Sequence, residues 1–192
     1  LFTAANNISG FKDIRFSVVR YGNVMGSRGS VIPFFINKRD SGATELPVTD
    51  ERMTRFNISL QAGVDLVMFA IGHHLGGEIF VPKIRSYHIV DVAKAIAPNL
   101  PIREIGIRPG EKLHEEMITM TDALNTIDLG KYYAILPSVS FKHKREEYLK
   151  HHNAVPVPEG FHYSSDKNTE WETVESMREN IRKYVDPNFT VK

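Results

Sequence analysis

In the stretch RYGNVMGSRGSVIPFF, residues 20–35, three glycines, two serines and Arg28 lie between an apolar, strand-like run and the apolar residues VIPFF. If a helix begins near residue 30, its first turn offers unpaired N–H groups and a partial positive charge to an anion, and Arg28 adds a charged donor. The stretch lacks the lysine of G-x-x-x-x-G-K-[ST] and does not fit G-x-G-x-x-G. Two interpretations therefore stay open: a phosphate-binding loop, or a tight turn with solvated serines.

Two further segments carry charged residues beside apolar ones. Arg55 lies in MTRF, at the entry to an expected long helix, and Arg108 opens RPGEK, with Glu111 three residues on. The proline–glycine turn of RPGEK separates a cation from a carboxylate, and such a pair suits a phosphate and a ribose hydroxyl. Helix capping and a salt bridge within the turn are the alternatives.

Metal and nucleophile chemistry is not indicated. The chain has no cysteine, and its adjacent histidine pairs, 73–74 and 151–152, would point in different directions on a helix. HEEM, 114–117, lacks the second histidine of H-E-x-x-H. No serine, histidine and carboxylate have the spacing of a catalytic triad. We expect no metal site.

Composition places the chain among proteins with one sizeable core, because 42% of its 192 residues are hydrophobic. The net charge is only +1, so no overall charge attracts nucleic acid or an anionic membrane. No apolar run approaches the ~18 residues of a membrane span, and no signal-peptide pattern is present. We expect a cytoplasmic protein that binds neither nucleic acid nor membrane.

Strand patterns alternate with helix patterns, which predicts an α/β fold. No repeat or low-complexity linker interrupts them, so we expect a single compact unit. LFTAANNI reads as the end of an amphipathic helix with Gly10 at its C-terminus, which suggests a piece of a longer protein. The expected strands are 14–20 (buried on both faces in a parallel sheet), 46–49, 76–83, 102–107 and 132–136; the expected helices are 30–40, 59–73, 88–97, the latter half of 108–117, 144–152 and 169–185.

Taken in order, six segments closely resemble the inverting UDP-N-acetylglucosamine 4,6-dehydratases, which are extended short-chain dehydrogenase/reductase proteins of bacterial glycan synthesis, such as that of pseudaminic acid. The segments are RYGNV, GSRGSVIPFF, LPVTDERMTRF, GGEIFVPK, DVAKAIAP and IGIRPGEKLHE. The resemblance covers essentially the whole chain and corresponds to the C-terminal portion of that family. It implies part of a Rossmann-type fold with a partial parallel sheet: residues 1–45 would end the NADP-binding region, and 46–192 would mainly bind the UDP-sugar.

The resemblance also implies site residues. Asn23 resembles a substrate contact near the diphosphate, and Arg55 the arginine that binds this group. Arg108 and Glu111 resemble the pair on the phosphate and the ribose. The segment that passes along the NADP cofactor would comprise Val24, Met25, Gly26, Ser27 and Arg28.

In that family, NADP oxidises the sugar at its fourth carbon, water is lost across the fifth and sixth, and the hydride returns to the sixth with inversion at the fifth. The family's Tyr-x-x-x-Lys pair, its aspartate–lysine pair and its glycine-rich fingerprint have no counterpart in these 192 residues. We therefore assign no catalytic residue and expect the chain to be inactive alone. Two hypotheses remain: the C-terminal part of a dehydratase that forms homo-oligomers, or a truncated, non-catalytic module for UDP-sugar binding or oligomerisation.

Overall fold

The computed structural model describes residues 1–10, 12–140 and 143–191. Its contacts divide the chain into two compact units, whereas the sequence predicts one. The first unit comprises Leu1–Tyr21, Gln61–Lys83 and Glu116–Tyr163; the second comprises Gly22–Leu60, Ile84–Glu115 and Ser164–Lys192. The chain passes between the units several times without a polar linker, so composition does not reveal the division. The roles expected for residues 1–45 and 46–192 stay predictions.

A mixed sheet forms the first unit, with strand order β1-β5-β10-β9-β11. The edge strand β1 pairs in parallel with β5, and the remaining neighbours are antiparallel. The strands are β1 (Val18–Val19), β5 (Ile79–Pro82), β9 (Thr126–Asp128), β10 (Tyr132–Ile135) and β11 (Val155–Pro156). A further pairing joins β8 (Glu116–Ile118) to β12 (Tyr163–Ser164).

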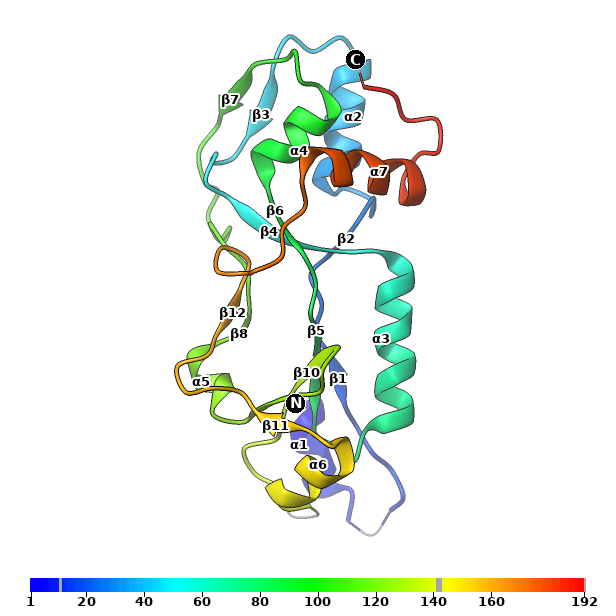
Figure 1. Ribbon diagram of the computed structural model, residues 1–192, viewed down its shortest axis with the longest axis vertical. Coiled ribbons are helices and arrows are strands. Elements are labelled where there is room, and N and C mark those ends of the chain that lie inside the picture. The colour runs from blue at the N-terminus through cyan, green and yellow to red at the C-terminus, as the bar shows by residue number, and fades with distance from the viewer. Residues whose placement is uncertain (11, 141–142, 192) are drawn as a thin grey trace. The chain divides into compact units, whose positions relative to one another are not determined.

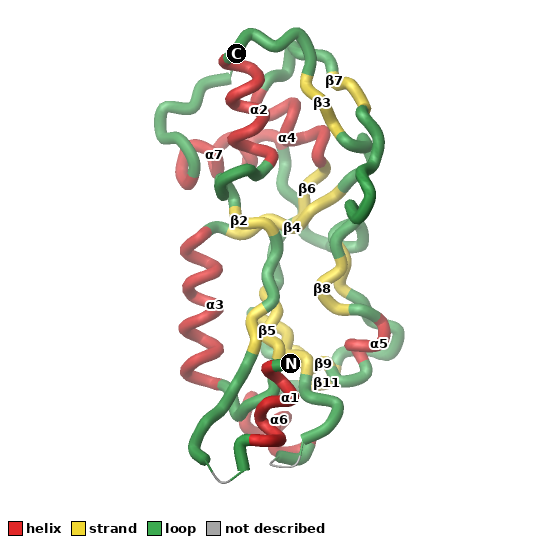
Figure 2. The backbone as a smooth tube through the Cα atoms, turned by 180° about the vertical axis from the view of Figure 1, so that it is seen from behind, coloured by secondary structure: helices red, strands yellow, loops and turns green. Residues whose placement is uncertain are grey.

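The helices of this unit, labelled in Figure 2, are α1 (Phe2–Ile8), α3 (Leu60–His73, whose first residue lies in the second unit), α5 (Met120–Ala123) and α6 (Arg145–His152). Helix α3 packs Leu66 and Ala70 against Phe80 of β5, and all three side chains are buried. Tyr148 of α6 joins the same core, and its hydroxyl donates to the carbonyl of Gly76 at 2.6 Å.

Two small sheets and three helices form the second unit (Figure 1). In one sheet β4 lies between β2, to which it is parallel, and β6, to which it is antiparallel; in the other, β3 and β7 are parallel. The strands are β2 (Asn23–Val24), β3 (Leu46–Val48), β4 (Thr54–Ile58), β6 (Ser86–His88) and β7 (Ile102–Glu104), and the helices are α2 (Val31–Asp40), α4 (Ile89–Ile96) and α7 (Val174–Tyr184).

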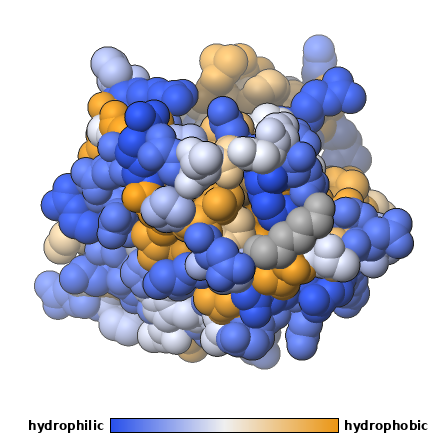
Figure 3. Space-filling model, turned by 90° about the horizontal axis from the view of Figure 1, so that it is seen from above, coloured by the Kyte–Doolittle hydropathy of each residue, from blue (hydrophilic) through white to orange (hydrophobic). Residues whose placement is uncertain are grey.

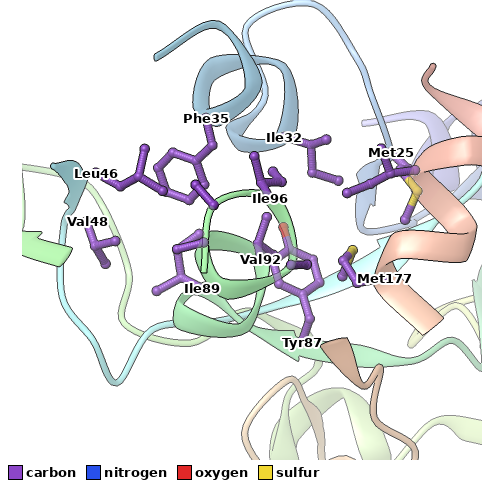
Figure 4. Packing of buried hydrophobic residues seen from close by; sticks show 14 of the residues in the cluster. Met25, Ile32, Phe35, Leu46, Val48, Tyr87, Ile89, Val92, Ile96 and Met177 are labelled. Atoms are coloured by element: carbon purple, nitrogen blue, oxygen red, sulfur yellow. The ribbon is translucent and has the colours of Figure 1, made fainter. Parts of the chain in front are cut away.

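Helix α4 occupies the centre of this unit's core (Figure 4). Its residues Val92 and Ile96 are fully buried among Phe35 of α2, Leu46 of β3 and Met177 of α7. Pro98 lies just beyond the end of α4 and disfavours further helix at Ala97. Seen from above, hydrophobic side chains reach the surface in small groups between hydrophilic ones (Figure 3).

The α/β class is confirmed, and parallel pairing joins β1 to β5, β2 to β4 and β3 to β7. The patterns at 46–49, 76–83, 102–107 and 132–136 contain β3, β5, β7 and β10, and those at 30–40, 59–73, 88–97 and 144–152 contain α2, α3, α4 and α6. The expected helix at the end of LFTAANNI is α1, and Gly10 beyond it has a left-handed φ of +58°.

Three expectations about the elements were wrong wholly or in part, since the strand at 14–20 and the helix at 169–185 do form but are shorter than expected. The run at 14–20 gives only the two-residue β1, half-buried because it lies at the edge of its sheet. The latter half of 108–117 forms no helix, because the N–H and carbonyl of Glu115 pair with Ser165. Helix α7 starts only at Val174, because the preceding residues 170–172 pair with Ser86 of β6.

The described residues contain neither a helix that could span a membrane nor a cluster that could hold a metal ion. Within 1–10, 12–140 and 143–191, no helix has the length and apolar character needed to cross a membrane. The same residues contain no cluster of three or more histidine, cysteine or acidic side chains arranged to hold a metal ion.

Candidate functional site

A pocket of about 500 Å³ lies within the second unit and gathers all four residues that the resemblance implies for substrate binding. They come from separate segments: Asn23 from β2, Arg55 from β4, and Arg108 and Glu111 from the loop after β7. The other lining residues are Gly29, Ser30 and Val31 at the start of α2, together with Phe34, Phe35, Pro47, Val48, Thr49, Met53, Tyr87, Ile89 and Ile105. The pocket therefore combines an apolar wall with a few charged and polar groups, as ligand sites do.

Asn23 reaches the pocket because β2 lies unusually close to β4. Gly22 precedes it, and a Cβ at that position would lie 2.5 Å from the Cβ of Phe56. β2 then pairs with β4 in the register Asn23–Asn57. The side-chain Nδ2 of Asn23 donates to Oε1 of Glu115 at 3.0 Å.

Arg55 is held by main-chain carbonyls. Its Nη1 donates to Thr54 at 2.7 Å and to Leu113 at 3.0 Å, and its Nη2 donates to Lys112 at 2.9 Å. Its Nε lies 3.7 Å from Oε1 of Glu115, and the side chain is only 15% exposed. Arg55 thus attaches the loop that carries Arg108 to strand β4.

Glu115 is a site residue that sequence reasoning missed. Its Oε1 faces Asn23 and Arg55, and its Oε2 accepts the main-chain N–H of Phe56 at 3.0 Å. The sequence places Glu115 in the acidic pair of HEEM, directly beside the exposed Glu116. Nothing in the pattern distinguishes the two, because the distinction comes from contacts with β2 and β4.

Tyr87 is the second missed residue. It lies on β6 opposite Arg55 in the β4–β6 register, it is buried, and the neighbouring amide of Asn23 acts to lower the pKa of its phenol. Burial, and then the negative charge of Glu115, raise the pKa of the Tyr87 phenol to about 12. The phenol is therefore neutral at physiological pH and keeps its proton for a hydrogen bond.

Arg108 and Glu111 lie at the exposed rim of the pocket. The carboxylate of Glu111 accepts the main-chain N–H of Arg108 at 3.1 Å, and the N–H of Glu111 donates back to the Arg108 carbonyl at 3.0 Å. Gly110 within this turn has φ +87°. Among the described residues, the Arg108 guanidinium has no hydrogen-bond or ion-pair partner, so the expected alternative of a salt bridge within the turn does not form.

Residues 24–28, the expected cofactor segment, do not line this pocket. Met25 is buried in the core, and its N–H donates to the Ile58 carbonyl at 2.9 Å. A Cβ on Gly26 would lie 2.8 Å from a methyl of Val185, so protein already fills the space beside it. Ser27 and Arg28 are exposed. A dinucleotide would therefore contact this segment mainly at its exposed end, Ser27 and Arg28.

Comparison with known proteins identifies relatives. The chain matches the family model described as polysaccharide biosynthesis protein over residues 1–137. The UDP-N-acetylglucosamine 4,6-dehydratase (inverting) of Campylobacter jejuni subsp. jejuni serotype O:2 is 51% identical over 184 residues, which are 94% of this chain and 55% of that protein. The UDP-glucose 4-epimerase of Rickettsia akari is 48% identical over 122 residues, which are 62% of this chain and 36% of that protein.

A solved structure is also similar. The X-ray structure of Pen from Bacillus thuringiensis superposes with a TM-score of 0.79 at 32% identity, covering 95% of this chain and 54% of that one. The chain thus spans about half the length of the curated dehydratases it matches. The resemblance to the inverting dehydratases is confirmed by this identity, and the chain belongs to the polysaccharide biosynthesis protein family.

Proposed function

We propose that this chain is the UDP-sugar-binding part of an NADP-dependent, C5-inverting UDP-N-acetylglucosamine 4,6-dehydratase of bacterial surface glycan synthesis. The observation that carries the proposal is the convergence of Asn23, Arg55, Arg108 and Glu111 on one pocket. The 51% identity to the Campylobacter enzyme supports the same substrate class. Homo-oligomer formation and a cytoplasmic location are part of the proposal.

The charges of the pocket suit a nucleoside diphosphate. Arg108 offers its guanidinium fork without an acidic partner among the described residues, and forks of this kind bind phosphate through two parallel hydrogen bonds. Within the described part of the chain, the carboxylate of Glu111 accepts one hydrogen bond, from the main-chain N–H of Arg108 at 3.1 Å, so it retains acceptor capacity for ribose hydroxyls. Phe34, Ile89 and Ile105 supply apolar area for a flat base.

Calorimetric titration with UDP tests the binding proposal. We expect Arg108→Ala to weaken UDP binding by tenfold or more, since a charge-assisted hydrogen bond contributes about 1.5–3 kcal/mol. Arg55→Ala should weaken it as well, through the lost charge and the released loop. Arg103→Ala is the matched control, because Arg103 pairs with Glu45 at 2.9 Å and does not line the pocket. If both Arg55→Ala and Arg108→Ala bind UDP as tightly as the wild type, the site assignment is wrong.

NADP would contribute hydride chemistry when bound. Of the proposed contacts Val24, Met25, Gly26, Ser27 and Arg28, only Ser27 and Arg28 are exposed. We therefore expect Arg28→Ala to weaken NADP binding, measured by calorimetry, and to leave UDP binding unchanged. Equal NADP affinity in wild type and variant would remove Arg28 from the cofactor site.

The second candidate function is a non-catalytic UDP-sugar-binding or oligomerisation module. It is favoured because no Tyr-x-x-x-Lys in this sequence stands at the place where the family has this pair; YSSDK, residues 163–167, has the spacing but lies far downstream of that place. Incubation of the chain alone with UDP-N-acetylglucosamine and NADP should give no 4-keto sugar under either reading. Steady production would contradict the expectation that the proton-transfer residues are absent. Restored turnover on addition of the N-terminal half of a dehydratase of this family would favour the first reading.

A further inference from the structure

Glu115 contacts two of the four residues named for substrate binding, Asn23 and Arg55. One carboxylate oxygen accepts from Nδ2 of Asn23 at 3.0 Å and lies 3.7 Å from Nε of Arg55. The other oxygen accepts from the main chain of Phe56 at 3.0 Å. Its side chain is 28% exposed and contacts two residues that line the pocket, Asn23 and Arg55. It does not itself line the pocket.

The main chain of Glu115 is fixed as firmly as its carboxylate. Its N–H donates to Oγ of Ser165 at 2.9 Å, and its carbonyl accepts the N–H of Ser165 at 2.8 Å. The hydroxyl of Ser165 is buried and lies 2.7 Å from the hydroxyl of Thr54, which in turn lies 2.8 Å from Nδ1 of His114. Because both its main chain and its carboxylate are hydrogen-bonded, Glu115 has little freedom to move away from Asn23.

The chemistry of this contact determines how Asn23 is oriented. An ionised carboxylate can only accept hydrogen bonds, so the NH₂ group of Asn23 must face Glu115. This removes the usual ambiguity between the oxygen and nitrogen of an amide side chain. Only Oδ1 and one N–H of Asn23 remain for the Tyr87 hydroxyl and for a ligand.

We propose that Glu115 is a positioning residue that fixes the amide of Asn23 and the guanidinium of Arg55 for a nucleoside diphosphate sugar. The proposal rests on the proposed function for the identity of its ligand. Glu115 acts through its two neighbours. The negative charge of Glu115 would by itself repel a diphosphate. The positive charge of Arg55 offsets it, and the N–H groups of Asn23 and Phe56 donate to the carboxylate.

Side-chain amide NMR signals, read beside UDP titrations, test this role directly. The NH₂ pair of Asn23 is identified as the pair lost in Asn23→Ala. We expect Glu115→Gln to shift that pair and to weaken UDP binding about tenfold. Glu115→Asp keeps the charge but shortens the side chain by one methylene, so it should show the same two effects. Glu116→Gln is the matched control: it removes the same charge one residue along, from an exposed side chain, and should change neither.

A double-variant cycle separates positioning from a general structural effect. In the Asn23→Ala background, Glu115→Gln should weaken UDP binding by less than threefold, because the group it orients is gone. A tenfold loss in both backgrounds, with an unchanged melting temperature, would overturn the proposal. Unchanged Asn23 signals in Glu115→Gln would also overturn it. If wild-type protein does not bind UDP, the proposed function fails, and the Asn23 signals alone decide whether Glu115 orients the amide.

Discussion

The buried carboxylate of Glu78 accepts a hydrogen bond from Nε2 of His152 at 3.2 Å, with the two side chains only 0% and 2% exposed. The same carboxylate accepts the N–H groups of Leu75 at 2.7 Å and Gly76 at 2.8 Å. Glu78 thereby joins the end of helix α6 to the turn before strand β5. It anchors the core of the first unit through polar groups that all have partners.

This arrangement predicts acid sensitivity. Burial raises the pKa of Glu78, but the hydrogen bonds from His152, Leu75 and Gly76 outweigh burial and lower that pKa below 4.5. A lowered pKa in the folded state means that the stabilisation is complete above pH 4.5 and is lost as the pH falls below it. Urea unfolding of the wild type should therefore show a falling free energy of unfolding below about pH 4.5.

Replacement of Glu78 tests the cause of that loss. Glu78→Gln should reduce the free energy of unfolding by about 2 kcal/mol near pH 7, because hydrogen bonds to a charged group are lost, and should flatten the dependence below pH 4.5. Glu159→Gln, at an exposed position of the same unit, should keep the wild-type dependence. An equally steep fall in Glu78→Gln would assign the acid sensitivity to other carboxylates.

Gly22 supports the site sterically. A Cβ there would lie 2.5 Å from Cβ and 3.2 Å from the carbonyl oxygen of Phe56. Because β4 cannot move without disturbing the core, we expect Gly22→Ala to lower the free energy of unfolding by about 2–3 kcal/mol. Gly72→Ala is the control: it lies in helix α3 with no atom within 4 Å of a built Cβ, and should raise stability by about 0.5–1 kcal/mol. Urea unfolding measures both. Equal changes would contradict the steric explanation.

The sequence predicts the longer elements well because local preferences and tertiary packing agree there. Helix α2 illustrates this: Pro33 stands in its first turn, where no N–H is needed, and Gly42 beyond its end has φ +76°. The short strands β2, β4 and β6 were not predicted. Their residues show no alternation of apolar and polar side chains. They form strands because β4 pairs with β2 and β6, which lie about 30 residues before and after it in the sequence.

For the site, the resemblance named four of the residues that line the pocket, but it missed Tyr87, which also lines it, and Glu115, which contacts Asn23 and Arg55. Asn23, Arg55, Arg108 and Glu111 belong to recognisable segments, and all four line one pocket. Glu115 and Tyr87 could not be selected, since their roles arise from contacts across strands. The contact of Arg55 with three carbonyls was equally hidden, because it depends on how the loop at 112–113 folds back on β4.

Thr173 caps the first turn of the last helix, α7. Its Oγ1 accepts the N–H of Ser176 at 3.1 Å, and the Ser176 hydroxyl accepts the N–H of Thr173 at 2.8 Å, which is a capping box. We expect Thr173→Ala to lower the free energy of unfolding by about 1 kcal/mol. The exposed Thr190→Ala should change it little. Urea unfolding at neutral pH compares the two, and an equal effect would show that the cap contributes nothing.

The hydroxyl of Tyr87 gives a prediction at alkaline pH. Its pKa, raised from 10.0 to about 12, means that its stabilisation is complete below pH 10 and is lost between pH 10 and 12. Tyr87→Phe should lower the free energy of unfolding by about 1 kcal/mol at neutral pH, and the difference from wild type should shrink above pH 10. Tyr21→Phe, at a 44% exposed side chain, should show neither effect. Urea unfolding at neutral and alkaline pH decides: a difference that stays constant above pH 10 would mean that neither burial nor Glu115 perturbs the phenol.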